Sequence, residues 1–491
     1  MKKTIIKLTA ISSLLITSCI SEDLNFNDDS KKAYDVSAES LLSNSQKGIS
    51  DQLASPSVNE NVFRYFSQYW AATLYTAESR YNLINRNIPG FHWNNLYRDV
   101  LGNLKSAEEV IQNEIKPDKT SATDWVKIQT NKKAIIEILR VYTYQNLVDT
   151  FGNVPYTESL KNQANILPKY DDAATIYSDL INRINNAINN LDLHSESFKS
   201  GDLVYNGNVE KWFKFANSLK VKLGINLSDF NPALSKQTVE TAVAGGLIVS
   251  NNDNALFKYS PSAPTYNPIY DNLVASNRND FVPAKTIVDY MNSLTDPRRS
   301  VFFTKLENNY VGGIYGAQNA NPYATSYSHI GDLIKKSDAF GVLIDAAEIN
   351  FLLAEAAERG YTVGNNAEHY YNSAITASMN YWNIPPADIN TYLSQPTINY
   401  TTATGSWKEK IGMQAWVAMY NRGFESWTFY RRLDYPILKA PTKAVAAADK
   451  KVPVRYTYPI SESTINGLNY TQASQAIGGD KLSTKIFWDK N

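Results

Sequence analysis

The sequence contains a single cysteine, Cys19, which follows a short apolar run near the start of the 491-residue chain. No disulfide can form within one copy of the chain, so burial and polar contacts alone must hold the folded state. A long chain can meet that demand, because a 300-residue domain buries roughly 75% of the surface that its unfolded chain exposes. The sequence after Cys19 therefore has to fold around an extensive core.

The first 18 residues have the order of an export signal. Lys2 and Lys3 are basic, an apolar run follows, and small residues precede Cys19. The run is shorter than the roughly 20 apolar residues that span a membrane. Ile16-Thr17-Ser18-Cys19 resembles a lipobox, whose cysteine is acylated and becomes the mature N-terminus.

We therefore expect residues 1–18 to be a lipoprotein signal peptide and Cys19 to be the lipidation site, with palmitate among its acyl chains. Residues 19–40 are polar and acidic, which predicts a flexible tether between the lipid and the fold. The alternative is an ordinary signal followed by a free cysteine.

The charge balance excludes one class of partner. Lys and Arg together number 48, as do Asp and Glu, so the chain lacks the positive footprint that nucleic acid requires. No later stretch is long and apolar enough to span a membrane. The lipid is therefore the one membrane contact that the sequence predicts.

Helical periodicity dominates after residue 40. Ile176, Leu180, Ile184, Ile188 and Leu191 recur at helical spacing behind Asp171 and Asp172, which can start a helix. Three further apolar stripes, about Trp212–Leu227, Leu343–Ala357 and Trp416–Trp427, have the same character, the last interrupted at Gly423. We predict a mainly α fold of tetratricopeptide-like helical pairs, in one large domain over residues 41–491.

Three long segments between the helices carry prolines, glycines or many tyrosines. They are Lys258–Val282, Glu307–Asp332 and Pro385–Ser406. Loops of this length are uncommon in compact domains unless they bind something. We expect them to build a ligand-binding surface.

Motifs for chemistry are scarce. The four histidines, His92, His194, His329 and His369, have no metal-ligand spacing, so we expect surface or capping roles, no metal site and no cofactor. Paired carboxylates leave a glycoside hydrolase open as an alternative. The candidate acids are Glu348 with Glu355, and Glu78, Asp99, Asp280 and Asp296.

Six segments in consistent order resemble the SusD/RagB family of nutrient-binding outer-membrane lipoproteins. The residues before residue 90 are closest to the branch called SusD-like 2. The six segments are Asp149–Tyr156, Lys169–Leu180, Asp202–Lys220, Asp296–Arg298, Glu348–Ala356 and Val452–Asn469. Most of these residues also have a packing explanation, so they identify the family without marking a binding site.

The resemblance implies a SusD-like fold whose helical pairs carry ligand-binding loops. It implies an outer-membrane, lipid-anchored protein facing the cell exterior, which captures an oligosaccharide or a peptide. It also implies that the protein is a lid on a SusC/RagA-like TonB-dependent barrel, with no catalytic activity. A structural or adhesion protein built on helical repeats is a further alternative.

In the family, ligand contacts come from loops in the N-terminal third and from a mid-chain insertion. Aromatic rings can stack on sugars, while Asn and Arg add directed hydrogen bonds. By position, the resemblance suggests that the ligand-binding residues are Trp93, Phe91, Asn94, Tyr323, Arg80 and Tyr81.

Overall fold

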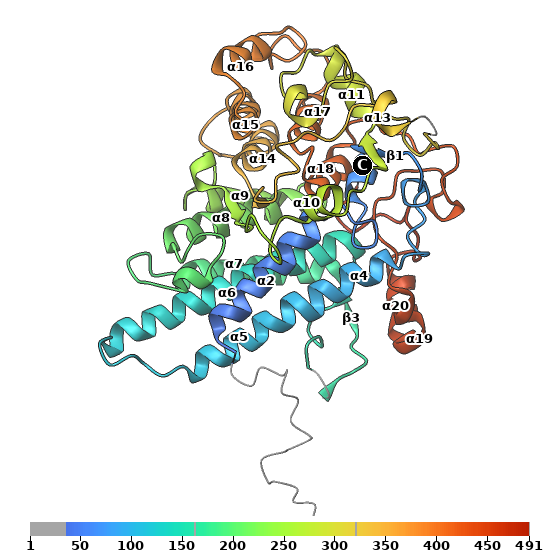
Figure 1. The fold of residues 1–491 in the computed structure, drawn as a ribbon. Coiled ribbons are helices and arrows are strands. Elements are labelled where there is room, and N and C mark those ends of the chain that lie inside the picture. The colour runs from blue at the N-terminus through green and yellow to red at the C-terminus, as the bar shows by residue number, and fades with distance from the viewer. Residues whose placement is uncertain (1–35, 162–163, 320–321, 491) are drawn as a thin grey trace, which may run out of the picture. The chain divides into compact units, whose positions relative to one another are not determined.

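The computed structural model describes residues 36–161, 164–319 and 322–490 (Figure 1). The predicted signal peptide, Cys19 and nearly all of the predicted tether lie outside the described residues. The compact unit Ala38–Asn491 is described below. Its first helix begins at Ala38, so the last three residues of the segment predicted as tether are helical.

Helices make up most of this unit, which confirms the predicted fold class. The α-helices are α2 (Ala38–Ala54), α3 (Phe63–Phe66), α4 (Ile88–Asn94), α5 (Gly102–Asn113), α6 (Ala122–Phe151), α7 (Ala173–Asn190), α8 (Val209–Asn226), α9 (Pro232–Val243), α10 (Pro268–Tyr270), α11 (Lys285–Ser293), α12 (Arg299–Phe302), α13 (Tyr323–Ser326), α14 (Ala346–Glu358), α15 (Ala367–Tyr381), α16 (Pro386–Leu393), α17 (Trp407–Ala418), α18 (Gly423–Leu433), α19 (Ile460–Ile465) and α20 (Gly467–Ala476). Short 3-10 turns are η1 (Glu78–Arg80), η4 (Lys199–Gly201), η5 (Asn251–Asp253) and η7 (Ala446–Ala448), and π-helical turns are η2 (Asn95–Leu101) and η6 (Asp271–Ala275).

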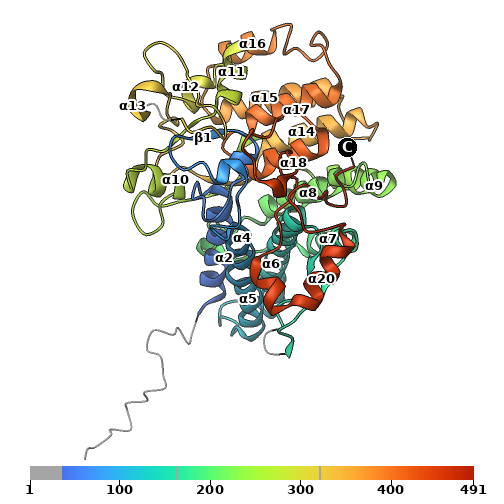
Figure 2. The same ribbon diagram turned by 90° about the vertical axis from the view of Figure 1, so that its right-hand side faces the viewer.

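Consecutive helices pack in pairs. The pairs α6 with α7, α8 with α9, α14 with α15 and α17 with α18 are in contact, and α8 also contacts α14. In both Figure 1 and Figure 2, α14, α15, α17 and α18 lie together at one end of the unit and α5, α6 and α7 at the other. This arrangement agrees with the predicted tetratricopeptide-like pairs.

The sequence of α7 explains why it forms where it does. The Asp172 side chain accepts a hydrogen bond from the Thr175 backbone N–H, which caps the helix N-terminus. Ile176, Leu180 and Ile184 are buried along one face, as the spacing predicts. Burial of three such side chains stabilises the fold by about 5–9 kcal/mol.

The structure corrects three of the predicted elements. Leu343 lies in a strand that precedes α14, because Asp345 caps the helix and breaks the apolar stripe. The segment Phe91–Asn94 is helical, since it lies in α4, which begins with Pro89 in its first turn. The segment predicted as a loop from residue 385 contains α16.

Six short strands form three antiparallel pairs among the described residues. The pairs are β1 (Trp70–Ala72) with β5 (Phe281–Pro283), β2 (Val154–Pro155) with β3 (Tyr170–Asp171) and β4 (Ala255–Phe257) with β6 (Gly341–Ile344). In the first pair Trp70 lies opposite Pro283. This pair brings the N-terminal third of the chain next to the segment that follows α10.

The C-terminal segment is held to the end of α6. Arg455 is fully buried and donates to the Phe151 carbonyl oxygen at 3.0 Å and to the Asp480 carboxylate at 2.7 Å. The Tyr458 hydroxyl donates to the Asn153 carbonyl oxygen at 2.8 Å. These contacts agree with the packing explanation of the C-terminal motif.

No helix among residues 36–161, 164–319 and 322–490 is both long enough and apolar enough to cross a membrane.

Candidate functional site

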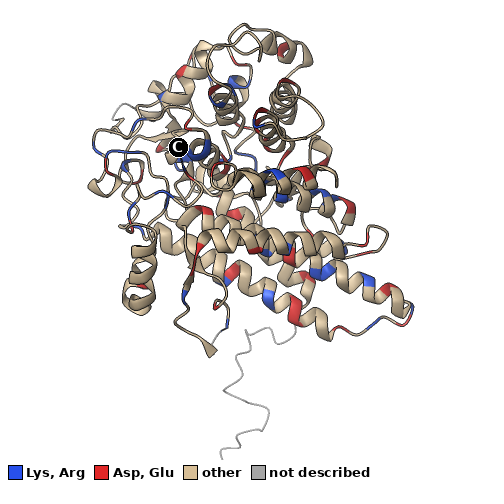
Figure 3. Ribbon diagram, turned by 180° about the vertical axis from the view of Figure 1, so that it is seen from behind, with Lys and Arg blue, Asp and Glu red and all other residues tan. Residues whose placement is uncertain are grey.

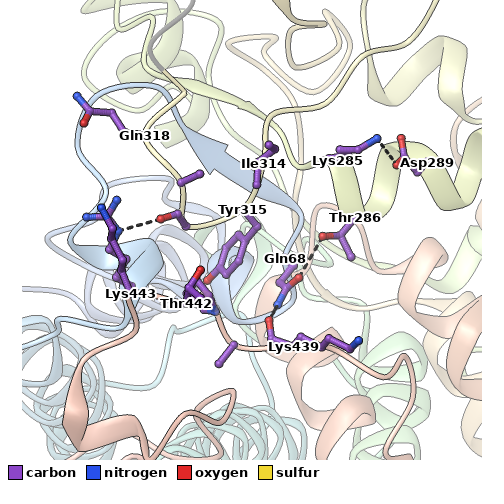
Figure 4. Close-up of a pocket in the computed structure, with 15 residues that line it drawn as sticks. Gln68, Lys285, Thr286, Asp289, Ile314, Tyr315, Gln318, Lys439, Thr442 and Lys443 are labelled. Atoms are coloured by element: carbon purple, nitrogen blue, oxygen red, sulfur yellow. Dashed lines mark hydrogen bonds and ion pairs between the residues drawn. The ribbon is translucent and has the colours of Figure 1, made fainter.

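A cleft of about 750 Å³ opens between loops that are far apart in the sequence (Figure 4). Its walls come from the residues around β1 and η1, the start of α11, the segment after Gly313, and the loop that follows α18. The lining residues are Gln68, Arg80, Lys285, Thr286, Asp289, Ile314, Tyr315, Gly316, Ala317, Gln318, Lys439, Ala440, Pro441, Thr442 and Lys443.

Hydrogen bonds to backbone oxygens fix these loops to one another. Arg80 Nε donates to the Gly316 carbonyl oxygen at 2.8 Å, and the Arg80 carbonyl accepts from the Val445 N–H at 2.9 Å. Gln68 Nε2 donates to the Lys439 carbonyl oxygen at 2.7 Å. Arg80 therefore links two walls of the cleft.

Two walls approach closely at one glycine. Gly316 has φ +67°, and a Cβ atom there would lie 2.3 Å from Cβ of Pro441. Both the left-handed backbone and the close approach favour glycine. Any larger residue would push the loop at 441 away from the loop at 316.

The cleft has a floor of buried tyrosines. The ring of Tyr315, only 9% exposed, lies with its centroid 6.3 Å from that of Tyr65 and 6.3 Å from that of Tyr81. Burial raises the pKa of all three phenols, so the hydroxyls stay neutral. Tyr315, the one of the three that lines the cleft, therefore presents an uncharged ring backed by the other two.

The structure places the six predicted ligand-binding residues in different surroundings. Arg80 lines the cleft, whereas Tyr81 is fully buried and packs beneath it against Phe66 and Tyr315. Tyr323 is half-buried outside the cleft lining and stacks on His329, with a centroid separation of 4.1 Å.

The other three predicted residues lie on α4, away from the cleft lining. Phe91 is 50% exposed and Asn94 is exposed. Trp93 is only 8% exposed, and its ring packs against Tyr97, Phe151 and two further tyrosines. The rings of Trp93 and Tyr81 are core residues in this conformation, so neither offers an open face to a ligand.

His92 was expected at the surface and is instead fully buried between α4 and α6. Its Nε2 lies 3.3 Å from Oγ1 of Thr150, and its ring contacts Phe63 and Phe151. Burial lowers the pKa of His92 to about 3. The expectation failed because helical spacing in α4 turns His92 inward, beside Trp93.

Sequence reasoning missed most of the cleft. The missed polar residues are Gln68, Lys285, Thr286, Asp289, Lys439, Thr442 and Lys443, whereas Gln318 lies in the predicted segment Glu307–Asp332. Single lysines and threonines in loops carry no periodic or motif signal. The available signal was compositional, because residues 439–451 hold four lysines and one aspartate.

All six candidate catalytic acids form ion pairs. Glu348 pairs with Lys222 at 2.7 Å, and Glu355 pairs with Arg432 at 2.9 Å, both deep in the helical core. The remaining pairs are Glu78 with Arg86, Asp99 with Arg98, Asp280 with Arg278 and Asp296 with Arg298. Five of these six carboxylates are buried, whereas Asp99 and its partner Arg98 lie at the surface.

Among the described residues, no three His, Cys, Asp or Glu side chains are grouped so that they could hold a metal ion.

Comparisons with known proteins agree with the fold. A family model described as "Starch-binding associating with outer membrane" matches residues 30–459. No curated protein sequence matches this chain.

Three solved structures are similar over nearly their whole length. A SusD homologue from Bacteroides uniformis is 26% identical, with a TM-score of 0.77 over 92% of this chain and 99% of that one. A chitin-binding SusD homologue from Flavobacterium johnsoniae is 24% identical, with a TM-score of 0.77 over 92% and 99%. A chitin-binding protein is 24% identical, with a TM-score of 0.78 over 92% and 100%.

The family model covers most of the chain, and the helical pairs match those of solved SusD homologues over more than nine-tenths of it. This chain therefore belongs to the SusD/RagB family.

Proposed function

We propose that the protein is a cell-surface nutrient-binding lipoprotein that captures a glycan in the cleft between Arg80, Gly316 and Thr442. The observation that carries this proposal is the cleft itself, which is large enough for several sugar residues and has hydrogen-bonding side chains on its walls. Arg80 and the tyrosine-rich segment, both suggested by the family resemblance, contribute to it.

A glycan is favoured over a peptide by two findings. The family model is described as starch-binding, and two of the similar solved structures are named as chitin-binding. The exposed Gln318 and Thr442 side chains can donate to and accept from sugar hydroxyls. A peptide is the second ligand class that the test below includes.

The proposal extends to transport. We expect Cys19 to carry a lipid that anchors the protein in the outer membrane, facing the cell exterior, and we expect it to close a SusC/RagA-like TonB-dependent barrel as a lid. Family membership supports this step, since the family model is described as associating with the outer membrane. The proposal includes no catalytic step.

The binding test uses the full chain and a panel of starch, chitin and acidic oligosaccharides together with mixed peptides, measured by isothermal titration calorimetry. Thr442→Trp places a bulky ring in the cleft at an exposed position, and Thr471→Trp is the matched control on the exposed surface of α20. We expect a glycan to bind the wild type and the control and to lose at least ten-fold in affinity with Thr442→Trp.

Equal affinity of the two variants for every bound ligand would refute the cleft as the site. Release of new reducing ends from a bound glycan would favour the hydrolase instead. Native mass spectrometry of the protein extracted gently from its membrane tests the transport step, and we expect recovery with a large barrel protein. Repeated recovery of the protein alone would contradict the lid.

A further inference from the structure

The cleft continues into a second hollow of about 380 Å³, which shares Lys439 and Ala440 with it. We call the two hollows together the basic groove. The second hollow is lined by Tyr430, Arg431, Asp434, Leu438, Lys439, Ala440, Lys450, Lys451, Val452, Val454, Lys485 and Asp489. One loop, residues 439–451, therefore runs along both hollows.

Besides the buried Arg431, five cations of the basic groove have no carboxylate partner among the described residues. They are Arg80, Lys439, Lys443, Lys450 and Lys451, and all four lysines are exposed. Arg80 donates only to a backbone carbonyl oxygen. Blue segments follow the loops to the left of the C-terminal end in Figure 3, where Lys and Arg are coloured.

The carboxylates of the groove do not neutralise these cations. Asp289 pairs with Lys285, and Asp489 pairs with Lys485 at 3.2 Å, so each is matched by its own lysine. Asp434 is the remaining acid of the lining and is exposed, so one carboxylate stands against these cations. The side chain of the neighbouring Asp449 accepts from Ser483 and faces Lys481 rather than the groove lysines.

This local excess of positive charge is distinctive because the whole chain has a formal net charge of zero. A concave surface lined by one sign of charge raises the local concentration of oppositely charged ligands. The backbone that carries Lys439 and Lys443 is also held at two points, by Gln68 at residue 439 and by Arg80 at residue 445. The groove is therefore organised to attract an anion.

The groove lacks an exposed aromatic platform. Tyr315 is buried and Tyr430 is half-buried, and no other aromatic residue of the part of the chain that the structure describes lines either hollow. Single-stranded nucleic acid is commonly bound by stacking of its bases on exposed aromatic rings, which this lining does not offer. Charged and hydrogen-bonding groups must do the recognition here.

We propose that the basic groove selects an acidic glycan, an oligosaccharide that carries carboxylate or sulfate groups, with its anionic groups along Lys439, Lys443, Lys450 and Lys451. This inference rests on the proposed function, because it names the class of glycan that the same cleft takes.

The test compares ligands with one backbone and different charge. Hexagalacturonate and its fully methyl-esterified form differ only in the carboxylates, and a chondroitin sulfate hexasaccharide supplies sulfate. We expect at least one acidic glycan to bind the full chain at least ten-fold more tightly than the esterified form. Because salt screens exposed charges, the affinity for the acidic glycan should fall as NaCl is raised from about 0.1 M to about 1 M.

The variants remove charge at exposed positions, so they leave the fold intact. Lys439→Gln with Lys443→Gln removes two groove cations, and Lys119→Gln with Lys161→Gln is the matched control, since both control lysines are exposed and neither lines the groove. Each groove substitution should weaken binding of the acidic glycan about two- to five-fold. The control pair should stay within two-fold of the wild type.

The outcomes separate this inference from the proposed function. The acidic class is overturned, while the proposed function stands, if a neutral glycan binds as tightly as any acidic one. That neutral glycan would also lose affinity with Thr442→Trp and keep its affinity with the lysine substitutions. If no ligand loses affinity with Thr442→Trp, both the acidic-glycan inference and the proposed function are overturned. Tighter binding of polyglutamate or of a single-stranded oligonucleotide than of any acidic glycan would also overturn the acidic-glycan class.

Discussion

Gly316 holds two walls of the cleft together, so a single methyl group at this position tests how the site is built. Its φ of +67° lies in the left-handed region, and a Cβ atom would lie 2.3 Å from Cβ and 2.8 Å from Cγ of Pro441. Gly316→Ala therefore adds two separate costs, a strained backbone and a clash between the loops.

A second glycine isolates the backbone cost. Gly360, just after α14, has φ +75° and no heavy atom within 4 Å of the position that its Cβ would take. Gly360→Ala should lower the free energy of unfolding by about 1–2 kcal/mol, the cost of left-handed backbone. Gly316→Ala adds a clash of about 1–3 kcal/mol, for a total of about 2–5 kcal/mol.

Urea denaturation measures how much unfolding free energy each variant loses. Hydrogen exchange of the Val445 amide measures separation of the loops, since that N–H donates to the Arg80 carbonyl oxygen. We expect Gly316→Ala to be the less stable variant and to show faster exchange at Val445. Equal stability of the two variants, together with unchanged exchange at Val445, would refute the close contact at Pro441.

Three further changes test other parts of the structure. Trp93→Ala should lower the free energy of unfolding by about 3–5 kcal/mol in urea denaturation, because its ring packs in the core, and unchanged stability would contradict that burial. Burial lowers the pKa of His92 to about 3, whereas the pKa of a histidine in the unfolded chain is about 6.5. The folded state therefore favours the neutral ring. The stability that the neutral ring provides is complete above about pH 6.5 and is lost as the pH falls toward 3. Between about pH 8 and about pH 4.5, the wild type should therefore lose roughly 2–3 kcal/mol more unfolding free energy than His92→Phe, and equal losses would show that His92 does not titrate in this way. Cys19→Ala should release the protein from membranes in cell fractionation, and continued retention would argue against the lipidation site.

The helical scaffold was predictable because it rests on patterns that lie close together in the sequence. The spacing of Ile176, Leu180 and Ile184, with Asp172 before them, is enough to specify α7, and the structure agrees. Leu343 was assigned wrongly because an apolar residue fits a buried strand as well as a helix, and only the cap at Asp345 separates the two.

The α4 segment shows how local signals mislead. Phe91–Asn94 was expected among the ligand-binding loops, yet Pro89 in the first turn starts a helix there. Phe91 and Asn94, three residues apart on one face of this helix, are exposed, while His92 and Trp93 enter the core. Aromatic composition indicated a binding surface, but the helix geometry decides which rings are available.

The cleft was only partly predictable. Arg80 and the segment around Tyr315 follow from the family resemblance, whereas Lys285, Lys439 and Lys443 do not. The walls are joined by contacts between residues more than 200 positions apart, such as Arg80 with Gly316 and Gln68 with Lys439. Such contacts arise from tertiary packing, for which a single sequence gives no spacing signal.

The most direct test of the central claim is hydrogen exchange of the full chain with and without a saturating glycan identified by the titrations. The account predicts protection in peptides that cover residues 76–84, 310–319 and 439–445, and loss of that protection in the Thr442→Trp variant. The account would be contradicted by protection confined to the exposed side of α4, around Phe91 and Asn94. It would also be contradicted by unchanged exchange in all three peptides with ligand bound.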